Sequence, residues 1–259
     1  MEPRKNRIMK AFSRSASTYD AYTDVQKVTA ANLIDRCENL QPKSILEIGC
    51  ATGNYTLMLA DRFPSSPITS IDFSEPMIKT ALLKLSGRKN IHFICNDAED
   101  FAERIKHQFD LITSNATLQW FSDLDRSLRE IADLLSVRGS FLCSIFGSQT
   151  FYELGLALSH AYGRAVALPA QNFPQKNKLL SLFSEMFSSF DIEELNFTYK
   201  YTSALQLLRH IRNTGTSGGN SLRPLILTRS RINAMDEWFT QNHKGCAVTY
   251  QVFSVKAVR

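Results

Sequence analysis

The fold is decided by one stretch, Ile45-Leu46-Glu47-Ile48-Gly49-Cys50-Ala51-Thr52-Gly53. An apolar run typical of a strand leads into a loop of small residues, and helical spacing follows at Tyr55–Arg62. Open parallel sheets bind their ligands at the carboxyl ends of strands, in loops of this kind. The stretch therefore predicts an α/β fold with a ligand site at the end of its first strand.

Strands and helices alternate on both sides of this loop. Strands are predicted at Ser44–Ile48, Ile68–Asp72, Ile91–Cys95, Leu111–Asn115 and Ser140–Phe146, with helices at Tyr55–Arg62, Met77–Lys84 and Leu124–Leu135. Pro76 after Ser74 marks a helix start, and Gly139 suits a helix end. Alternating strands and helices form right-handed βαβ units. We predict a Rossmann-like, doubly wound, mostly parallel seven-stranded sheet, with helices on both faces and a helical lid.

The flanking segments are predicted to complete a single domain over residues 1–259. Residues 1–40 form an N-terminal helical lid segment with a helix at Asp24–Asn39, and residues 43–150 form the core. Residues 147–225 form an inserted lid and substrate-facing segment, broken near Pro169 and Pro174. Residues 191–259 supply closing strands, the last at Ala247–Val258, around helical stretches at 203–213 and 231–242 and a glycine-rich turn at Gly215–Gly219.

Composition excludes several classes of protein. The hydrophobic fraction of 44% and the charged fraction of 21% are those of a globular chain. No apolar run approaches the roughly 18 residues that cross a bilayer, and the N-terminus lacks the apolar core of a signal peptide. We therefore expect a cytoplasmic protein with no membrane partner. Five scattered cysteines without a CxxC pair support neither disulfides nor a zinc site, so no metal is expected.

The net charge of +5 is concentrated at the two ends of the chain. Residues 1–14 hold five Lys or Arg against one acidic residue, and residues 200–259 hold nine against two. If the two ends meet, they form a positive face that suits an acidic partner: a nucleic acid, an anionic membrane surface or an acidic protein. The alternative is a set of solvated charges.

The spacing of the glycines indicates which ligand the loop binds. A dinucleotide site needs G-x-G-x-x-G, whereas Gly49 and Gly53 are four apart and Glu47 precedes them. A carboxylate beside the loop repels pyrophosphate and suits the ammonium of S-adenosylmethionine (SAM). Asp72, about 20 positions further on, can accept hydrogen bonds from both ribose hydroxyls. Taken singly, the loop could be a tight turn and Asp72 a helix cap.

Two more predicted strand ends contribute to the pocket. Asp97 and Ala98 follow the third strand, where a carboxylate beside a backbone amide can bind the edge of an adenine. Asn115 ends the fourth strand, and Trp120 opens the next segment. Asp97 could equally be a turn residue, and Trp120 could belong to the core.

These residues resemble the class I SAM-dependent methyltransferases over about residues 40–150. The whole chain resembles the malonyl-acyl-carrier-protein O-methyltransferases of biotin synthesis through three stretches: Phe12-Ser13-Arg14-Ser15-Ala16-Ser17-Thr18-Tyr19-Asp20 with Gln26; Asn115-Ala116-Thr117-Leu118-Gln119-Trp120; and Leu207-Leu208-Arg209-His210-Ile211-Arg212-Asn213-Thr214-Gly215. Ala51 departs from the pattern, because a glycine usually stands there. An alanine requires an ordinary φ at this position but adds only a methyl group, so we expect cofactor binding to survive.

The resemblance implies methyl transfer from SAM to the free carboxylate of a malonyl thioester on acyl carrier protein, or of malonyl-CoA. It places Tyr19 and Gln26 over SAM and turns Arg212 toward the substrate. The cofactor-binding set is Tyr19, Gln26, Glu47, Gly49, Cys50, Gly53, Asp72, Phe73, Met77, Asp97, Ala98 and Asn115. The catalytic residues are Tyr19 and Arg212, and the substrate-binding residues are His210, Arg212 and Trp120. Arg212 could also be a structural ion-pair residue, and His210 a packing or solvated one.

Other functions fit the sequence less well. The stretch at 207–215 argues against a trans-aconitate-type carboxyl methyltransferase and against a quinone C-methyltransferase. Base methyltransferases usually carry an N/D-P-P-Y/F motif where this chain has Ser114-Asn115-Ala116-Thr117, so no nucleic-acid partner is expected. A SAM-binding module without catalysis would have little use for an apolar lid.

Overall fold

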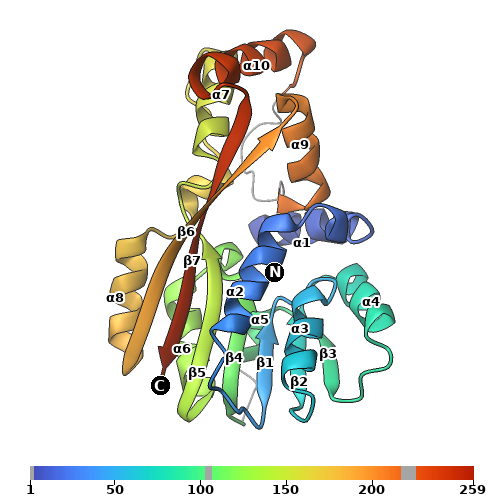
Figure 1. Ribbon diagram of the computed structural model, residues 1–259, viewed down its shortest axis with the longest axis vertical. Helices are drawn as coiled ribbons and strands as arrows, with labels where there is room; N and C mark the ends of the chain where they lie inside the picture. Colours follow the sequence, from blue (N-terminus) through green and yellow to red (C-terminus); the bar gives the residue numbers. More distant parts are fainter. Residues whose placement is uncertain (1–2, 103–106, 217–225) are drawn as a thin grey trace.

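The structure is a computed structural model that describes residues 3–102, 107–216 and 226–259. Its centre is a seven-stranded sheet in the order β3-β2-β1-β4-β5-β7-β6 (Figure 1). The strands are β1 (Ile45–Ile48), β2 (Ile68–Asp72), β3 (Ile91–Cys95), β4 (Phe109–Asn115), β5 (Leu135–Phe146), β6 (Ser189–Tyr201) and β7 (Cys246–Val258). The strands β1 to β5 pair in parallel, and β7 is antiparallel to β5 and β6. This confirms the predicted doubly wound sheet.

Helices cover both faces of the sheet. They are α1 (Pro3–Ser15), α2 (Asp24–Asp35), α3 (Asn54–Arg62), α4 (Glu75–Lys84), α5 (Ala98–Ala102), α6 (Leu124–Leu134), α7 (Tyr152–Tyr162), α8 (Lys176–Met186), α9 (Ala204–Asn213) and α10 (Arg229–His243), with short 3-10 turns η1 (Tyr19–Ala21), η2 (Leu118–Trp120) and η3 (Pro169–Asn172). Leu33 of α2 and Leu59 of α3 are buried on one face, and Leu128 of α6 and Phe183 of α8 on the other. Strand residues alternate between these two clusters, as the period of two requires.

Most predicted boundaries agree with the structure to within a few residues. Helix α4 begins as predicted, because the Ser74 hydroxyl accepts a hydrogen bond from the Met77 N–H and Pro76 occupies the first turn. Helix α2 ends at Asp35 rather than Asn39, since the chain there tightens into turns.

The prediction that Gly139 ends a helix is wrong, because α6 ends at Leu134 and β5 begins at the next residue. Phe109 of β4 pairs with Leu135, but the next pair is Leu111 with Ser140, so residues 136–139 bulge out of the ladder. A Cβ on Gly139 would lie 2.8 Å from the Ser136 carbonyl oxygen. The glycine thus permits the close backbone approach of a bulge.

The lid lies beyond the carboxyl ends of the parallel strands, where β6 and β7 run out from the sheet to reach it (Figure 1). A buried cluster joins α1, α7, α9 and α10 through Ile8, Leu158, Leu207 and Phe239. The range 147–225 does not form the lid as one block, because its helix α8 packs on the face of the sheet beside α6. The predicted turn at Gly215–Gly219 falls outside the described residues after Thr216.

Candidate active site

Three adjoining cavities open at the carboxyl ends of the strands. We call them the strand-end cavity (lined by Tyr19, Asp72, Phe73, Met77, Asp97, Ala98 and Trp120, among others), the loop cavity (Tyr19, Thr23, Gln26, Gly49, Cys50, Asn115) and the lid cavity (Gln26, Trp120, Leu154, Phe173, His210, Arg212). Tyr19 lines the first two, Trp120 joins the first to the lid cavity, and Gln26 joins the second to it. All predicted cofactor and substrate residues except Glu47 and Gly53 therefore line this group of adjoining cavities.

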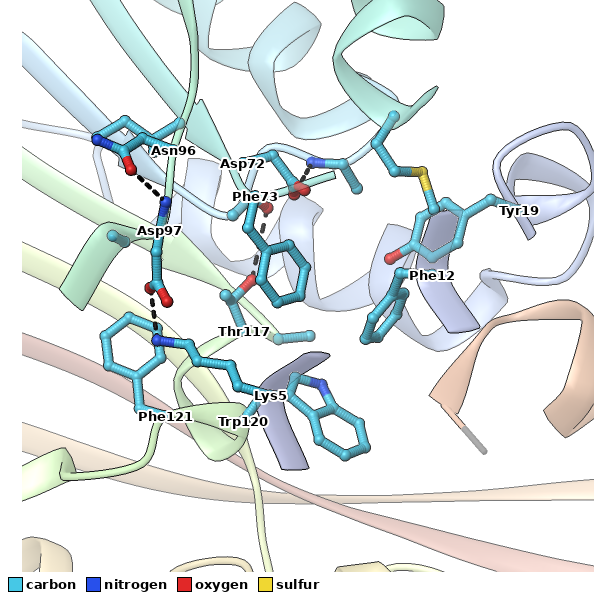
Figure 2. A pocket seen from close by; sticks show the side chains of 16 residues that line it. Lys5, Phe12, Tyr19, Asp72, Phe73, Asn96, Asp97, Thr117, Trp120 and Phe121 are labelled. Carbon is cyan, nitrogen blue, oxygen red and sulfur yellow. Dashed lines mark hydrogen bonds and ion pairs between the residues drawn. The ribbon is translucent and has the colours of Figure 1, made fainter. Parts of the chain in front are cut away.

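Asp72 ends β2 with its carboxylate fixed in place (Figure 2). Its Oδ2 accepts the Ala51 N–H at 2.9 Å and its Oδ1 accepts the Ser74 N–H at 2.8 Å. Burial raises its pKa to about 6, against the opposing effect of these two amides. Each oxygen keeps a lone pair for a ligand hydroxyl, so Asp72 suits a ribose as predicted.

Gly49 and Gly53 serve different purposes in the loop. A Cβ on Gly49, whose φ is +79°, would lie 2.1 Å from the Thr117 hydroxyl oxygen. A Cβ on Gly53, whose φ is +83°, would lie 2.9 Å from the Leu85 side chain. Gly49 lines both the strand-end and loop cavities, whereas Gly53 lies outside the lining of both and lets α3 start close to α4.

The expectation of an ordinary φ at Ala51 is wrong. Its φ is +46°, in the left-handed region that favours glycine. The conformation is imposed by hydrogen bonds on either side, since Cys50 donates to the Ile71 carbonyl at 3.0 Å and Ala51 donates to Asp72. The methyl group is therefore tolerated at a conformational cost of about 1–2 kcal/mol.

Glu47 is buried beneath the loop rather than facing the cavities. It is 1% exposed, it does not line the strand-end or loop cavity, and one carboxylate oxygen accepts the Ser70 hydroxyl at 2.7 Å. Its other oxygen has no hydrogen-bond partner in the described part of the chain. Burial raises the pKa of Glu47 to about 7. Its link to a ligand ammonium stays a prediction.

Asp97 is already engaged by the lid (Figure 2). Lys5 of α1 approaches its Oδ1 at 2.5 Å and also pairs with Glu99, and the Lys5 side chain is only 9% exposed. The Asp97 N–H donates to the Asn96 side chain at 2.8 Å. The sequence does not distinguish Lys5 from the other charges of residues 1–14, yet its ion pairs hold α1 over the strand-end cavity.

Asn115 links α2 to the carboxyl ends of β4 and β5 through hydrogen bonds. Its Oδ1 accepts the hydroxyls of Thr29 at 2.8 Å and Ser144 at 2.6 Å, and its amide donates to the Gln26 carbonyl at 2.9 Å. Asn115 thus fixes the position of Gln26. Beside it, Thr23 lines the loop cavity with a buried hydroxyl that has no partner among the described residues. A polar ligand in this cavity would satisfy that hydroxyl.

The N-terminal segment is tied to the body and to α9. Asp20 accepts hydrogen bonds from Asn54 at 2.9 Å and Lys84 at 2.7 Å. Thr18 donates to the Asn213 carbonyl at the end of α9 at 3.1 Å. Helices α1 and α9, one from each basic end of the chain, are therefore neighbours, whereas the C-terminus itself lies at the opposite end of the strands (Figure 1).

The predicted substrate residues line the lid cavity together. His210 lies edge-on to Tyr22 and Tyr201, with ring centroids 5.4 and 5.2 Å away, and burial lowers its pKa. Trp120 is 7% exposed and packs between Phe12 and Phe173, so it is both a core residue and a cavity wall. Arg212 is exposed and has no ion-pair partner in the described ranges, which leaves its guanidinium free for an anion.

Comparison with known proteins identifies the family. A family model described as a methyltransferase domain matches residues 46–143. A malonyl-[acyl-carrier protein] O-methyltransferase of Priestia megaterium is 40% identical over 268 residues, covering 95% of this chain and 94% of its own. The chain belongs to the malonyl-[acyl-carrier protein] O-methyltransferases. Another relative of that name, from Acetivibrio thermocellus, is 34% identical and covers 93% of this chain and 90% of its own.

Solved structures share the fold of this malonyl-[acyl-carrier protein] O-methyltransferase family member. The YcgJ protein of Bacillus subtilis superposes with a TM-score of 0.61 at 16% identity, covering 89% of this chain and 97% of its own. The N-methyltransferase NodS of Bradyrhizobium japonicum, solved with S-adenosylhomocysteine, gives 0.55 at 14% identity and covers 98% of both chains. At such identities the likeness concerns the fold alone.

Proposed function

We propose that this chain is an enzyme that transfers the methyl group of SAM to the free carboxylate of a malonyl thioester on acyl carrier protein, early in biotin synthesis. The observation that carries this proposal is the junction of the cavities: Gln26 and Trp120 wall both the cofactor side and a lid cavity that contains Arg212. Identity of 40% over nearly the whole length to a relative of that name supports the same acceptor.

The residues of the strand-end and loop cavities fit SAM. Acidic groups at 8% exposure, Asp72 and Asp97, stand at neighbouring strand ends. The cations of the two linings, Lys5 and Lys27, already pair with carboxylates. Such a lining disfavours a pyrophosphate and suits a ligand with a positive charge. We assign Asp72 to the ribose, Phe73 and Met77 to the adenine faces, Asp97 and Ala98 to the adenine edge, and Gly49, Cys50 and Thr23 to the amino-acid end.

SAM supplies a methyl group bonded to a positively charged sulfur. A malonyl carboxylate has a pKa near 3–4, so it is ionised at pH 7 and needs no general base. Its oxygen forms a bond to the methyl carbon while the carbon–sulfur bond breaks, the electron pair stays on sulfur, and both charges disappear. Alignment of the two reactants can contribute about 7–11 kcal/mol. The protein therefore has to align the two reactants, exclude water from the site and select the acceptor.

Tyr19 and Arg212 divide these tasks in our proposal. Burial, together with the nearby Asp72 carboxylate, raises the pKa of Tyr19, so its hydroxyl keeps its proton and acts as a hydrogen-bond donor rather than a base. Arg212 holds a full carboxylate charge more strongly than one that is being neutralised, so it stabilises the bound substrate more than the transition state.

The basic surface of α1 and α9 is proposed to attract the acidic carrier protein. The exposed side chains of Arg7, Lys10, Arg14, Arg209 and Arg212 have no ion-pair partner among the residues described. Steering by such a face raises association rates 10- to 1000-fold and weakens with salt. We also propose a cytoplasmic location: the cysteines are free thiols, and the described chain contains no helix long and apolar enough to cross a membrane.

One assay tests the proposal. The protein is incubated with methyl-labelled SAM and, separately, malonyl-carrier protein, malonyl-CoA, free malonate and trans-aconitate. Label should enter the malonyl thioesters, with the carrier protein preferred over CoA. Preferential labelling of trans-aconitate would identify the rival carboxyl methyltransferase, and binding of SAM with no labelled acceptor would indicate a binding module.

A further inference from the structure

The lid cavity is larger than a malonyl group requires. It holds about 1330 Å³ of space not filled by atoms, open solvent at its mouth included, compared with about 610 Å³ for the strand-end cavity. The malonyl group has a single methylene between its carboxylate and its thioester carbonyl. Much of the lid cavity is therefore left over when that group reaches the cofactor.

The surplus space is walled by apolar side chains. Leu154 and Leu158 of α7 are 2% and 1% exposed, and Phe173 beyond η3 is 7% exposed. They belong to the same buried cluster as Met235 and Phe239 of α10, which support the wall from behind. The wall is thus a packed part of the core, and the space beside it favours hydrocarbon over polar groups.

Polar groups gather at other parts of the same cavity. Gln26 also lines the loop cavity, and Arg212 and Leu227 are exposed residues of the lid-cavity lining. A pantetheine arm contains two amides, which would lose hydrogen bonds against Leu154 and Leu158. Methylene groups have no hydrogen bonds to lose there, and the burial of each one strengthens binding by about fourfold.

We propose that the enzyme also methylates ω-carboxyacyl thioesters with chains longer than malonyl, whose methylene groups lie against Leu154, Leu158 and Phe173. The inference rests on the proposed function and extends its acceptor class. The reaction is the same transfer: the terminal carboxylate oxygen bonds the methyl carbon of SAM, sulfur keeps the electron pair, and no proton moves. The terminal carboxylate keeps the place proposed for the malonyl carboxylate, beside Arg212 and the cofactor, and the thioester end lies toward the exposed Leu227.

The test compares malonyl, glutaryl and adipyl thioesters on one carrier protein, so that docking is constant. For the wild type, kcat/KM of the two longer acceptors should be no more than about tenfold below that for malonyl. Leu168→Phe narrows the cavity at a half-buried wall residue and should lower kcat/KM for adipyl at least about tenfold, with little change for malonyl. Leu156→Phe, on the outer side of α7 and 38% exposed, is the matched control and should change neither.

The possible outcomes separate this inference from the proposed function. Wild-type activity on malonyl with a loss greater than tenfold for glutaryl and adipyl would overturn the inference and leave the function intact. An equal effect of Leu168→Phe on malonyl and adipyl would also overturn it. Failure to methylate malonyl itself would remove the proposed function.

Discussion

Substitution of Gly49 by alanine isolates what the cofactor loop demands of its backbone. The new Cβ would lie 2.1, 2.4 and 2.7 Å from three atoms of the Thr117 side chain, and φ is +79°. The left-handed conformation costs an alanine about 1–2 kcal/mol, and overpacking adds typically 1–3 kcal/mol. Gly49→Ala should therefore destabilise the protein by about 2–5 kcal/mol. At about 2–4 °C per kcal/mol for a chain of this size, the melting temperature should fall by roughly 4–20 °C.

Gly163→Ala provides the matched control. Gly163 ends α7 with φ at +61°, and a Cβ there meets no atom within 4 Å, so the substitution carries the conformational cost without the clash. Its melting temperature should fall by only about 2–8 °C, measured by calorimetry. SAM affinity, measured by titration calorimetry, should fall in Gly49→Ala alone. Equal destabilisation of the two variants would refute the role assigned to Thr117.

Three further substitutions test the lid, the buried carboxylate and the substrate contact. Lys5→Met leaves Asp97 and Glu99 buried without their cation when α1 is closed, so we expect SAM affinity to fall at least about tenfold. Arg7→Met, exposed on the same helix, is the control. Equal SAM affinities in the two variants would contradict the role of Lys5 in closing α1 over the cavity. Glu47 has a folded pKa of about 7 instead of 4.5, so the folded protein holds a proton that the unfolded chain releases, and stability falls by about 3 kcal/mol as pH rises through this window. Glu47→Gln should then match the wild type near pH 5 and exceed it at pH 8 in urea unfolding; a difference independent of pH would show that the carboxyl does not titrate in this range. With a small malonyl thioester as acceptor, Arg212→Ala should raise KM roughly 10- to 100-fold and change kcat far less, whereas Arg209→Ala, outside the lid cavity, should leave both unchanged; a large fall in kcat with KM intact would refute the assignment. Activity on the carrier-protein substrate should fall at least about tenfold with rising salt, while a small malonyl thioester should be much less sensitive, and equal salt responses would count against the docking face.

The sequence predicted the parts of the fold that depend on local pattern. Strand ends at Asp72, Asp97 and Asn115 could be placed because apolar runs stop there, and parallel strands bring their carboxyl ends to one edge. The bulge at 136–139 could not be predicted, because it arises from the pairing of Phe109 with Leu135 across the sheet. The local sequence does not indicate which residues of β4 and β5 pair with each other.

The same distinction between local sequence pattern and contacts across the fold applies to the candidate active site. Gly49 could be recognised from its loop, but the left-handed φ of Ala51 is set by hydrogen bonds to β2 rather than by its own side chain. The pairing of Lys5 with Asp97 joins residues 92 positions apart and cannot be read from either neighbourhood. Glu47 is a different case, because its position before the glycines predicts a ligand contact, while its side chain is 1% exposed and lies outside the linings of the strand-end and loop cavities. That contact stays a prediction.

The N-terminal segment has a consequence for the order of events in turnover. Lys5, Phe12 and Tyr19 cover the strand-end cavity, and Tyr22, Val25 and Gln26 wall the lid cavity a few residues later. A movement of this segment that admits the cofactor therefore also dismantles the acceptor's binding surface. We therefore expect the cofactor to be the first reactant to enter and its demethylated product the last to leave.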